Sequence, residues 1–116
     1  MSPDHNMILK LMEKLEFKNK GPKNNNPFLP PFEDGLFITK LQKTHNLLFN
    51  KFPLYQNHVL VVTRIFEMQD HDVSKEDFEN SYITLTALNG FCFYNSSKKS
   101  GASQRHKHLQ IVPYAQ

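Results

Sequence analysis

The sequence predicts an α+β domain in which an antiparallel sheet carries helices on one face. Three observations lead to this fold class. The 116 residues suit one domain. Apolar runs of strand length follow one another as three strands, one helix and two strands. Parallel neighbours need a helical crossover, so a chain with one helix between its strands disfavours an α/β sheet.

Composition and charge narrow the class of protein. Hydrophobic residues make up 39% of the chain, and the formal net charge is +3. This mild charge suits an anionic ligand such as a nucleotide, and it is well short of a nucleic-acid-binding tail. One cysteine, Cys92, excludes an internal disulfide. No apolar run has the length of a signal peptide or a membrane span, so we expect a cytoplasmic protein without a membrane partner, or alternatively a nuclear one.

Residues 1–25 are expected to form an N-terminal helix and an asparagine-rich linker. Apolar residues recur at helical spacing between Ile8 and Leu15, which predicts an amphipathic helix over about residues 4–17. The next stretch, 18–35, is rich in Pro, Asn and Gly and predicts a loop. Residues 26–116 then form the main domain.

Three apolar runs follow the loop and predict strands at residues 35–41, 45–52 and 57–64. A short polar link joins the first two as a hairpin. The third is rich in β-branched residues and predicts a central strand. Two more strands are predicted at residues 91–95 and 105–113.

A helix is predicted between the third and fourth strands. Ser74 and Asp77 have the spacing of a capping box, and Asn89 followed by Gly90 marks the end of the helix. Four larger apolar residues at helical spacing are expected to form its buried stripe. They are Phe78, Tyr82, Leu85 and Leu88.

The chemical pattern is clearest in the last predicted strand, where His106, His108 and Gln110 stand at every second position. Side chains alternate across a strand, so these three share one face, while Lys107 lies on the other face with the apolar residues. The apolar face is expected to pack against the helix. Polar groups on the first face must meet water, each other or a ligand.

Three interpretations of this histidine face stay open on the residues alone. It could be an exposed polar strand face without a role. It could attack phosphorus, because an imidazole near neutral pH is both a nucleophile and a leaving group. It could also hold zinc, although no further ligands stand at diagnostic spacing. The remaining candidates for zinc ligands are His45, His58, His71 and Cys92.

The turn before the strand favours attack on phosphorus. Residues 100–104 offer backbone N–H groups and hydroxyls to phosphate oxygens, and Lys98 and Lys99 can neutralise a polyphosphate. The amide of Gln110 can donate to a phosphate oxygen without adding charge. Only nucleophilic catalysis uses the turn and the strand together, and it requires one imidazole of the strand to lie open to an anion-lined pocket.

The motif GASQRHKHLQ, residues 101–110, resembles the histidine-triad signature in the His-x-His-x-Gln form of its nucleotidyltransferase branches. With NPFLPPFEDGLFI, HNLLFNKFPLYQNHVLVVT and FCFYNSSKKSGASQRHKHLQIVP, it resembles the diadenosine tetraphosphate phosphorylases (ATP adenylyltransferases). The resemblance covers about residues 26–113. It implies a histidine-triad-like (HIT-like) catalytic domain at 26–116 that lacks the C-terminal region of longer members.

The resemblance implies a role for each residue of the motif. His108 would attack the α-phosphate of a dinucleoside polyphosphate, His106 would support it, and Gln110 would bind the phosphate. Inorganic phosphate would then resolve the nucleotidyl-histidine to give ATP and ADP. The substrate- and phosphate-binding residues that the resemblance implies are Asn95, Gly101, Ser103, Gln104, Asn46 and Asn50.

The implied partners are nucleotides, namely diadenosine polyphosphate, ATP, ADP and phosphate, and no nucleic acid. A divalent cation, magnesium, would accompany the substrate, and neither a covalently bound cofactor nor a resident metal is implied. A truncated, non-catalytic nucleotide-binding domain is the alternative, and Gln110 disfavours a hydrolase that releases AMP. An open sheet edge favours a homodimer.

Several residues outside the motif are expected to have structural roles. His58 is expected to be a strand-edge histidine bonded to backbone, although a histidine stands at a similar place in the wider superfamily. Phe28, Leu29 and Phe32 are expected to pack the long loop onto the sheet, with stacking on adenine as the alternative. Cys92 is expected to be buried on a central strand and unreactive.

Overall fold

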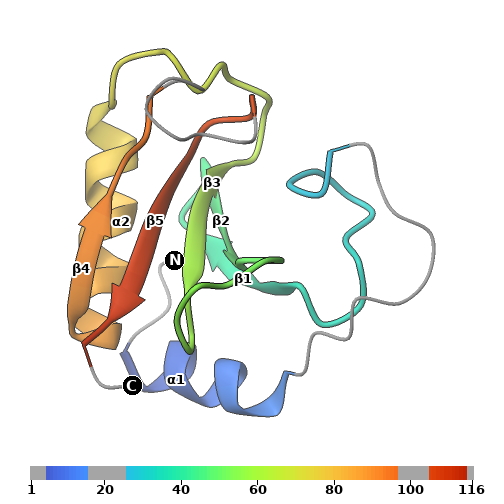
Figure 1. Cartoon of the computed structure of the whole chain (residues 1–116), viewed down its shortest axis with the longest axis vertical. Coiled ribbons are helices and arrows are strands. Elements are labelled where there is room, and N and C mark those ends of the chain that lie inside the picture. Colours follow the sequence, from blue (N-terminus) through green and yellow to red (C-terminus); the bar gives the residue numbers. More distant parts are fainter. Residues whose placement is uncertain (1–4, 16–25, 97–104, 115–116) are drawn as a thin grey trace.

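The computed structural model describes residues 5–15, 26–96 and 105–114. Figure 1 shows helices packed against a five-stranded sheet. In chain order the elements are α1 (His5–Lys14), β1 (Phe37–Leu41), β2 (His45–Phe49), β3 (Val59–Thr63), α2 (Lys75–Leu88), β4 (Gly90–Phe93) and β5 (His108–Pro113). No helix within the described ranges is long and apolar enough to cross a membrane.

The strands form one sheet in the order β1-β2-β3-β5-β4, and every neighbouring pair is antiparallel. β1 and β2 form the hairpin that the sequence predicts. β3 lies at the centre and is buried along its whole length, as its β-branched residues predict. The α+β class with an antiparallel sheet is therefore confirmed.

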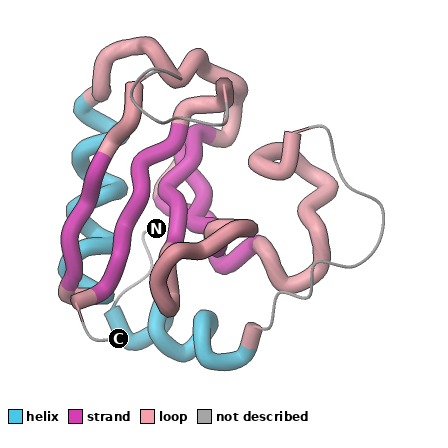
Figure 2. Tube along the Cα trace, in the orientation of Figure 1, coloured by secondary structure: helices cyan, strands magenta, loops and turns pink. Residues whose placement is uncertain are grey.

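The helices cover one face of the sheet, and a loop covers the other. Figure 2 shows α2 running alongside β4 and β5 and α1 lying across the lower end of the molecule. The main core lies between the helices and the sheet. Its buried residues are Ile8, Met12, Ile38, Leu41, Leu47, Val59, Val61, Ala87, Leu88, Leu109 and Ile111. A smaller cluster on the opposite face holds Phe28, Leu48, Leu60 and Val62.

α1 lies within the range predicted for the first helix and belongs to the same core as the sheet. Ile8 is fully buried there and Met12 nearly so, which accounts for the helical spacing of the apolar residues. Residues 16–25 lie outside the described residues. The division of the chain at residue 25 therefore stays a prediction.

β5 begins at His108, later than residue 105, where the sequence predicts its start. His106 forms only an isolated bridge with Met68. The stretch before β5 bonds both to the end of β3 and to the loop between β3 and α2. Thr63 N donates to Lys107 O at 3.4 Å, and Lys107 N donates to Glu67 O at 2.8 Å. The two histidines of the motif thus lie on either side of a strand boundary.

β4 is an edge strand, so the expectation that Cys92 lies on a central strand is wrong, and its side chain is half-buried. Burial still raises the pKa of its thiol. Gly90 begins β4 immediately after α2. A Cβ at Gly90 would lie 2.1 Å from Val112 O, so the close approach of the two strands requires glycine.

α2 has the predicted ends but a different buried face. The capping box of Ser74 and Asp77 is present, and Asn89 caps the C-terminus in the left-handed conformation. Phe78 and Tyr82 are 68% and 59% exposed, so the apolar stripe predicted for them is wrong. The helix residues that are buried are Asp77, Asn80, Ser81, Thr84, Ala87 and Leu88. The N-terminal half of α2 presents a polar face to the sheet because it meets buried polar groups there.

Candidate functional site

The sheet face that the helices leave free carries the polar residues of the motif. Asn46 on β2 is paired with Val62 on β3, and Val62 with His108 on β5. Two residues further along β5, Gln110 is paired with Leu60. Directly paired residues of an antiparallel sheet lie on the same face, so His108 and Gln110 share a face, as predicted.

His108 has one ring nitrogen bonded to backbone and one that no described residue contacts by a hydrogen bond. Nδ1 donates to His106 O at 2.8 Å, which places the proton on Nδ1 and leaves a lone pair on Nε2. Burial lowers the pKa of the His108 imidazole, so the ring is neutral at neutral pH. An unprotonated Nε2 in a fixed tautomer is the form of histidine that can attack an electrophile.

His106 has hydrogen bonds at both ring nitrogens. Nε2 donates to Thr63 O at 2.7 Å, and Nδ1 accepts from Asn26 Nδ2 at 2.9 Å. Burial lowers the pKa of this imidazole too. A ring held in this way has no nitrogen left for a substrate. The backbone carbonyl of His106 accepts from His108, and the ring bonds of His106 fix this residue beside Thr63 and Asn26.

Gln110 belongs to a cluster that sequence reasoning missed. His58 Nε2 donates to Gln110 Oε1 at 2.8 Å, and Asn50 Nδ2 lies 3.3 Å from His58 Nε2. The expectation that His58 bonds to backbone is wrong, because its partners are side chains. Since Oε1 of Gln110 is the acceptor, its amide NH₂ is left to donate elsewhere. Burial lowers the pKa of His58, which keeps it neutral.

Phe28 covers the histidines from the loop that precedes β1. The centroid of its ring lies 5.1 Å from that of His108 and 5.7 Å from that of His106, each in an edge arrangement. His108 is only 5% exposed, so the expectation that its ring lies open to a pocket is wrong for this conformation. Phe28 also belongs to the buried cluster with Leu48, Leu60 and Val62, which agrees with packing instead of adenine stacking.

The other residues predicted to bind substrate are spread over the site. Asn46 is buried on β2, where its Oδ1 accepts from Arg64 Nε at 3.2 Å. Asn95 lies just beyond β4 and is half-buried. Asn50 lies beside Gln110, as described above. Gly101, Ser103 and Gln104, together with Lys98 and Lys99, lie outside the described residues.

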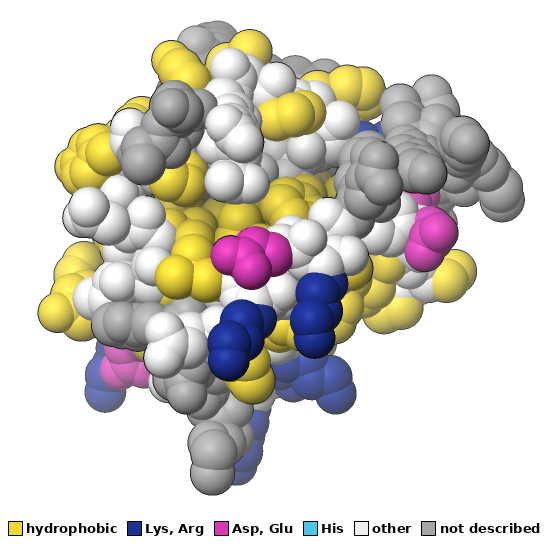
Figure 3. Space-filling model, turned by 90° about the horizontal axis from the view of Figure 1, so that it is seen from below, with side chains coloured by type: hydrophobic (Ala, Val, Ile, Leu, Met, Phe, Trp, Pro, Cys, Tyr) yellow, Lys and Arg dark blue, Asp and Glu magenta, His cyan; other side chains and the backbone are white. Residues whose placement is uncertain are grey.

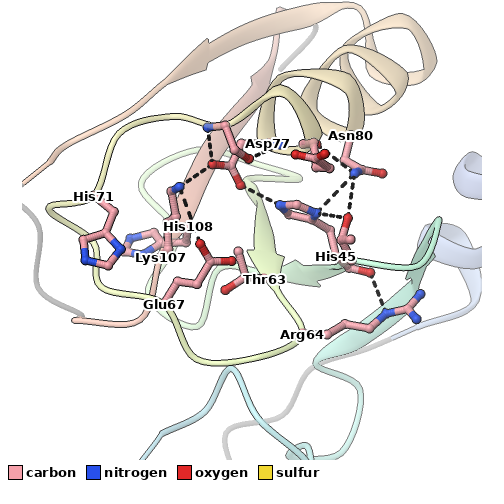
Figure 4. A network of polar contacts seen from close by, with 12 residues as sticks. His45, Thr63, Arg64, Glu67, His71, Asp77, Asn80, Lys107 and His108 are labelled. Carbon is pink, nitrogen blue, oxygen red and sulfur yellow. Dashed lines mark hydrogen bonds and ion pairs between the residues drawn. The ribbon is translucent and has the colours of Figure 1, made fainter.

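A second polar cluster lies on the helix-covered face, directly behind the histidines. Lys107 is 1% exposed, and its Nζ contacts Asp77 Oδ2 at 2.5 Å and donates to Asp72 O at 2.5 Å. His45 Nε2 donates to Asp77 Oδ1 at 2.6 Å. Figure 4 shows these side chains pointing toward one another from different elements. We refer to Lys107, Asp77, His45 and Asn80 as the buried ion-pair network.

Asp77 is the centre of this network. Burial by itself raises the pKa of a carboxyl, but the hydrogen bonds from His45 and Lys107 outweigh it and hold the pKa of Asp77 well below its usual range. Asn80 Nδ2 donates both to Glu76 O at 2.8 Å and to His45 Nδ1 at 3.1 Å. The two ring nitrogens of His45 thus lie between Asn80 on one side and Asp77 on the other.

A cavity of about 240 Å³ lies at the end of the molecule near α1. Its lining residues are Leu9, Met12, Glu13, Asn57, Leu88 and Pro113. Figure 3, viewed from below, shows hydrophobic side chains at the centre of this end with charged side chains beside them. None of the motif residues lines this cavity.

The zinc interpretation has no support in the described part of the chain. No group of three or more His, Cys, Asp and Glu side chains there could hold a metal ion. His45 and His58 lie on opposite faces of the sheet, each with side-chain hydrogen bonds of its own. In the described residues, the histidine face offers an imidazole lone pair and an amide donor, the groups that attack on phosphorus needs.

Comparison with known proteins identifies similar sequences in yeast. A family model described as the Ap4A phosphorylase N-terminal domain matches residues 5–116. The chain is 34% identical over 113 residues to Protein APA1 of Saccharomyces cerevisiae, which covers 88% of this chain and 35% of that protein. It is 35% identical over 108 residues to diadenosine 5',5'''-P1,P4-tetraphosphate phosphorylase 2 of the same yeast, covering 82% and 33%. The chain thus spans about a third of the length of these relatives.

Solved structures share the fold. The crystal structure of yeast Ap4A phosphorylase Apa2 in complex with AMP superposes with a TM-score of 0.75 at 26% identity, over 100% of this chain and 53% of that one. A histidine triad protein from Clostridium difficile gives a TM-score of 0.54 at 14% identity, over 67% of this chain and 80% of that one. The second likeness concerns the fold alone, and it agrees with the HIT-like fold expected from the motif.

Proposed function

The chain belongs to the Ap4A phosphorylase N-terminal domain family, and we propose that it splits dinucleoside polyphosphates by transferring a nucleotidyl group to inorganic phosphate. The names of the similar yeast proteins support diadenosine tetraphosphate as the substrate, and the AMP complex of one of them supports a nucleotide site. The mildly basic charge of this chain agrees with an anionic substrate.

The observation that carries the proposal is the state of the His108 ring. Its Nδ1 proton is bonded to His106 O, and no described residue bonds to Nε2. The nucleophilic nitrogen is therefore defined and unprotonated, and no residue of the described part of the chain competes for it. When Nε2 gains a bond to phosphorus, the ring becomes cationic, and the Nδ1–H bond to the carbonyl strengthens as that charge develops.

The reaction balances as two displacements at the same phosphorus atom. Nε2 of His108 attacks the α-phosphorus of diadenosine tetraphosphate, and the bond to the bridging oxygen breaks to release ATP. An oxygen of inorganic phosphate then attacks the adenylyl-histidine, and the P–N bond breaks to release ADP and the neutral ring. Water in place of phosphate would release AMP.

Gln110 is proposed to bind an oxygen of the reacting phosphate. Its Oε1 accepts from His58, so the NH₂ group is the end of the amide left for a ligand. A neutral donor can stabilise the additional charge of the transition state without holding a phosphate product tightly. Asn46 and Asn50 are proposed to contact the nucleoside, and Asn95, Gly101, Ser103 and Gln104 the phosphates.

Access to His108 requires a shift of Phe28, which packs against the ring in this conformation. Phe28 precedes the first strand of the sheet and lies in a segment rich in proline, outside the regular strands. We propose that the entering nucleotide displaces this side chain. The apolar neighbours of Phe28 would then contact the substrate and help to exclude water, which favours phosphate as the acceptor.

Magnesium and a second copy of the chain are also part of the proposal. A divalent cation would arrive with the polyphosphate, since the described residues offer no group of acidic or imidazole ligands to hold it beforehand. β4 is an edge strand on which Phe91 is 40% exposed, which favours pairing of two copies. Sedimentation velocity that shows a monomer at all concentrations would rule the pairing out.

The test is phosphorolysis of diadenosine tetraphosphate by the chain in the presence of phosphate and magnesium. We expect equal amounts of ATP and ADP, and a His108→Ala variant that is slower by at least about 10³-fold. His71→Ala is the matched control, because His71 is an exposed histidine outside the site. Binding without turnover would instead support a non-catalytic nucleotide-binding domain, and AMP as product would support a hydrolase.

A further inference from the structure

The side chain of Gln69 bonds to both backbone groups of His108. Gln69 lies in the loop between β3 and α2 and is 4% exposed. Its Oε1 accepts from His108 N at 2.7 Å, and its Nε2 donates to His108 O at 3.1 Å. The same Nε2 donates to Asn95 O at 2.5 Å. One amide therefore joins the proposed nucleophile to a residue that is proposed to bind phosphate.

This arrangement replaces a missing step of the β4–β5 ladder. Phe93 on β4 is paired with Gln110 on β5, and continuing that register would pair Asn95 with His108. β4 ends at Phe93, and the amide of Gln69 occupies the place between the two backbones. A carboxamide carries the same donor and acceptor as a peptide group, so it can satisfy buried backbone that would otherwise be unpaired.

Gln69 is itself held from two sides. Its backbone N donates to Arg105 O at 2.7 Å, and its carbonyl accepts from the hydroxyl of Tyr94. The amide is thus fixed relative to the stretch that enters β5 and to the stretch that leaves β4. A rigid spacer between these stretches determines how far Asn95 stands from His108.

We propose that Gln69 is a positioning residue that aligns the backbone of His108 with His106 on one side and Asn95 on the other. This inference rests on the proposed function, because it assigns Gln69 a part in the same reaction. Without the amide, His108 would lose two backbone hydrogen bonds. Its Nδ1 would then no longer be kept against His106 O, and the ring would not hold one tautomer.

The test compares Gln69→Met with Gln42→Met, the same change at an exposed glutamine. In ¹⁵N NMR of the imidazoles, we expect wild type and Gln42→Met to show His108 protonated at Nδ1. We expect Gln69→Met to show a mixture of tautomers. In phosphorolysis, we expect Gln69→Met to lower kcat by about 10²-fold and to change KM by less than about threefold, because misplacement of the reacting atom affects chemistry more than binding.

A single Nδ1–H tautomer in Gln69→Met would overturn the inference, whatever the activity. Unchanged kcat per folded molecule would also overturn it. A wild-type chain without phosphorolysis would contradict the proposed function instead, and the NMR comparison would still decide on Gln69.

Gln69→Glu provides a second variant if the methionine chain does not fold. An ionised carboxylate keeps the acceptor for His108 N but opposes the carbonyl oxygens of His108 and Asn95. A protonated one can donate to one of them. We therefore expect the kcat of Gln69→Glu relative to wild type to rise as the pH falls from 8 to about 5.5, because burial raises the pKa of a carboxyl into this range. A ratio that does not change with pH would count against the positioning role.

Discussion

The two faces of the segment from His106 to Gln110 differ in whether their polar groups have partners within the protein. On the helix side, the ammonium of Lys107 meets the carboxylate of Asp77 and a backbone carbonyl, so the protein itself compensates the buried charge. On the open side, Nε2 of His108 and the NH₂ of Gln110 have no hydrogen-bond partner among the described residues. Lys107 and His108 are both buried, and Gln110 is half-buried.

The difference shows how a structural polar group can be told from a functional one. A buried charge that is fully partnered holds elements together, and removing one partner destabilises the fold. A buried group with an unused donor or lone pair is costly unless a ligand or water meets it. The partners of Lys107 and the unused groups of His108 and Gln110 thus distinguish the two sides of this segment.

The largest expected effect is on stability and comes from the helix side. Lys107→Met leaves the buried carboxylate of Asp77 without its cation, and we expect a loss of about 3–5 kcal/mol in the free energy of unfolding. Denaturant unfolding measures it. Lys75→Met is the matched control, since Lys75 is 82% exposed and pairs with Glu79 at 3.7 Å, and we expect a change of about 0–1 kcal/mol there. Equal changes in the free energy of unfolding for the two substitutions would contradict the structural role given to Lys107.

An intermediate effect is expected on turnover from the open side. His58→Phe removes the donor that orients Gln110, and we expect kcat to fall by about tenfold, the equivalent of one hydrogen bond of about 1–1.5 kcal/mol. Stability should change little, because Nδ1 of His58 is buried without a partner in the described structure and an apolar ring removes that penalty. His71→Phe serves as control. Steady-state kinetics that give the same kcat for both variants would mean that Gln110 needs no such support.

The smallest expected effect is a displacement of the pH profile. Burial lowers the pKa of His108, and the ring must be unprotonated to attack. The acid limb of kcat/KM should therefore lie below pH 6.5, the ordinary pKa of histidine. The same shift makes the unfolded chain bind the proton more readily, so this contribution to stability is present above pH 6.5 and is lost as the pH falls. An acid limb at or above pH 6.5 would contradict the burial of the ring.

Local pattern was sufficient for the order of elements and for the faces of the last strand. Alternation along the chain places His108 and Gln110 on one side and Lys107 on the other because strand geometry repeats every second residue. The capping box of Ser74 and Asp77 was equally predictable, since its partners stand three residues apart. These features depend on backbone geometry within a few residues.

The errors concern contacts between distant parts of the chain. Phe78 and Tyr82 have helical spacing, yet they lie on the outer side of α2. The helix instead turns Asp77 and Asn80 toward the sheet, where they contact His45 and Lys107. The helix contains enough apolar residues for more than one stripe. The choice of face depended on partners that lie about thirty residues away in either direction, and their positions are not encoded in the helix itself.

The sequence by itself determined the element order, the antiparallel sheet and the histidine face, because backbone periodicity and capping are local. Only the tertiary structure decided that Lys107 is buried in an ion pair, that His58 holds Gln110, and that the amide of Gln69 joins His108 to Asn95. The physical reason is that a polar side chain can form the same hydrogen bond or ion pair with many different groups of the chain. Which one it meets is settled when strands and loops from distant parts of the chain come together.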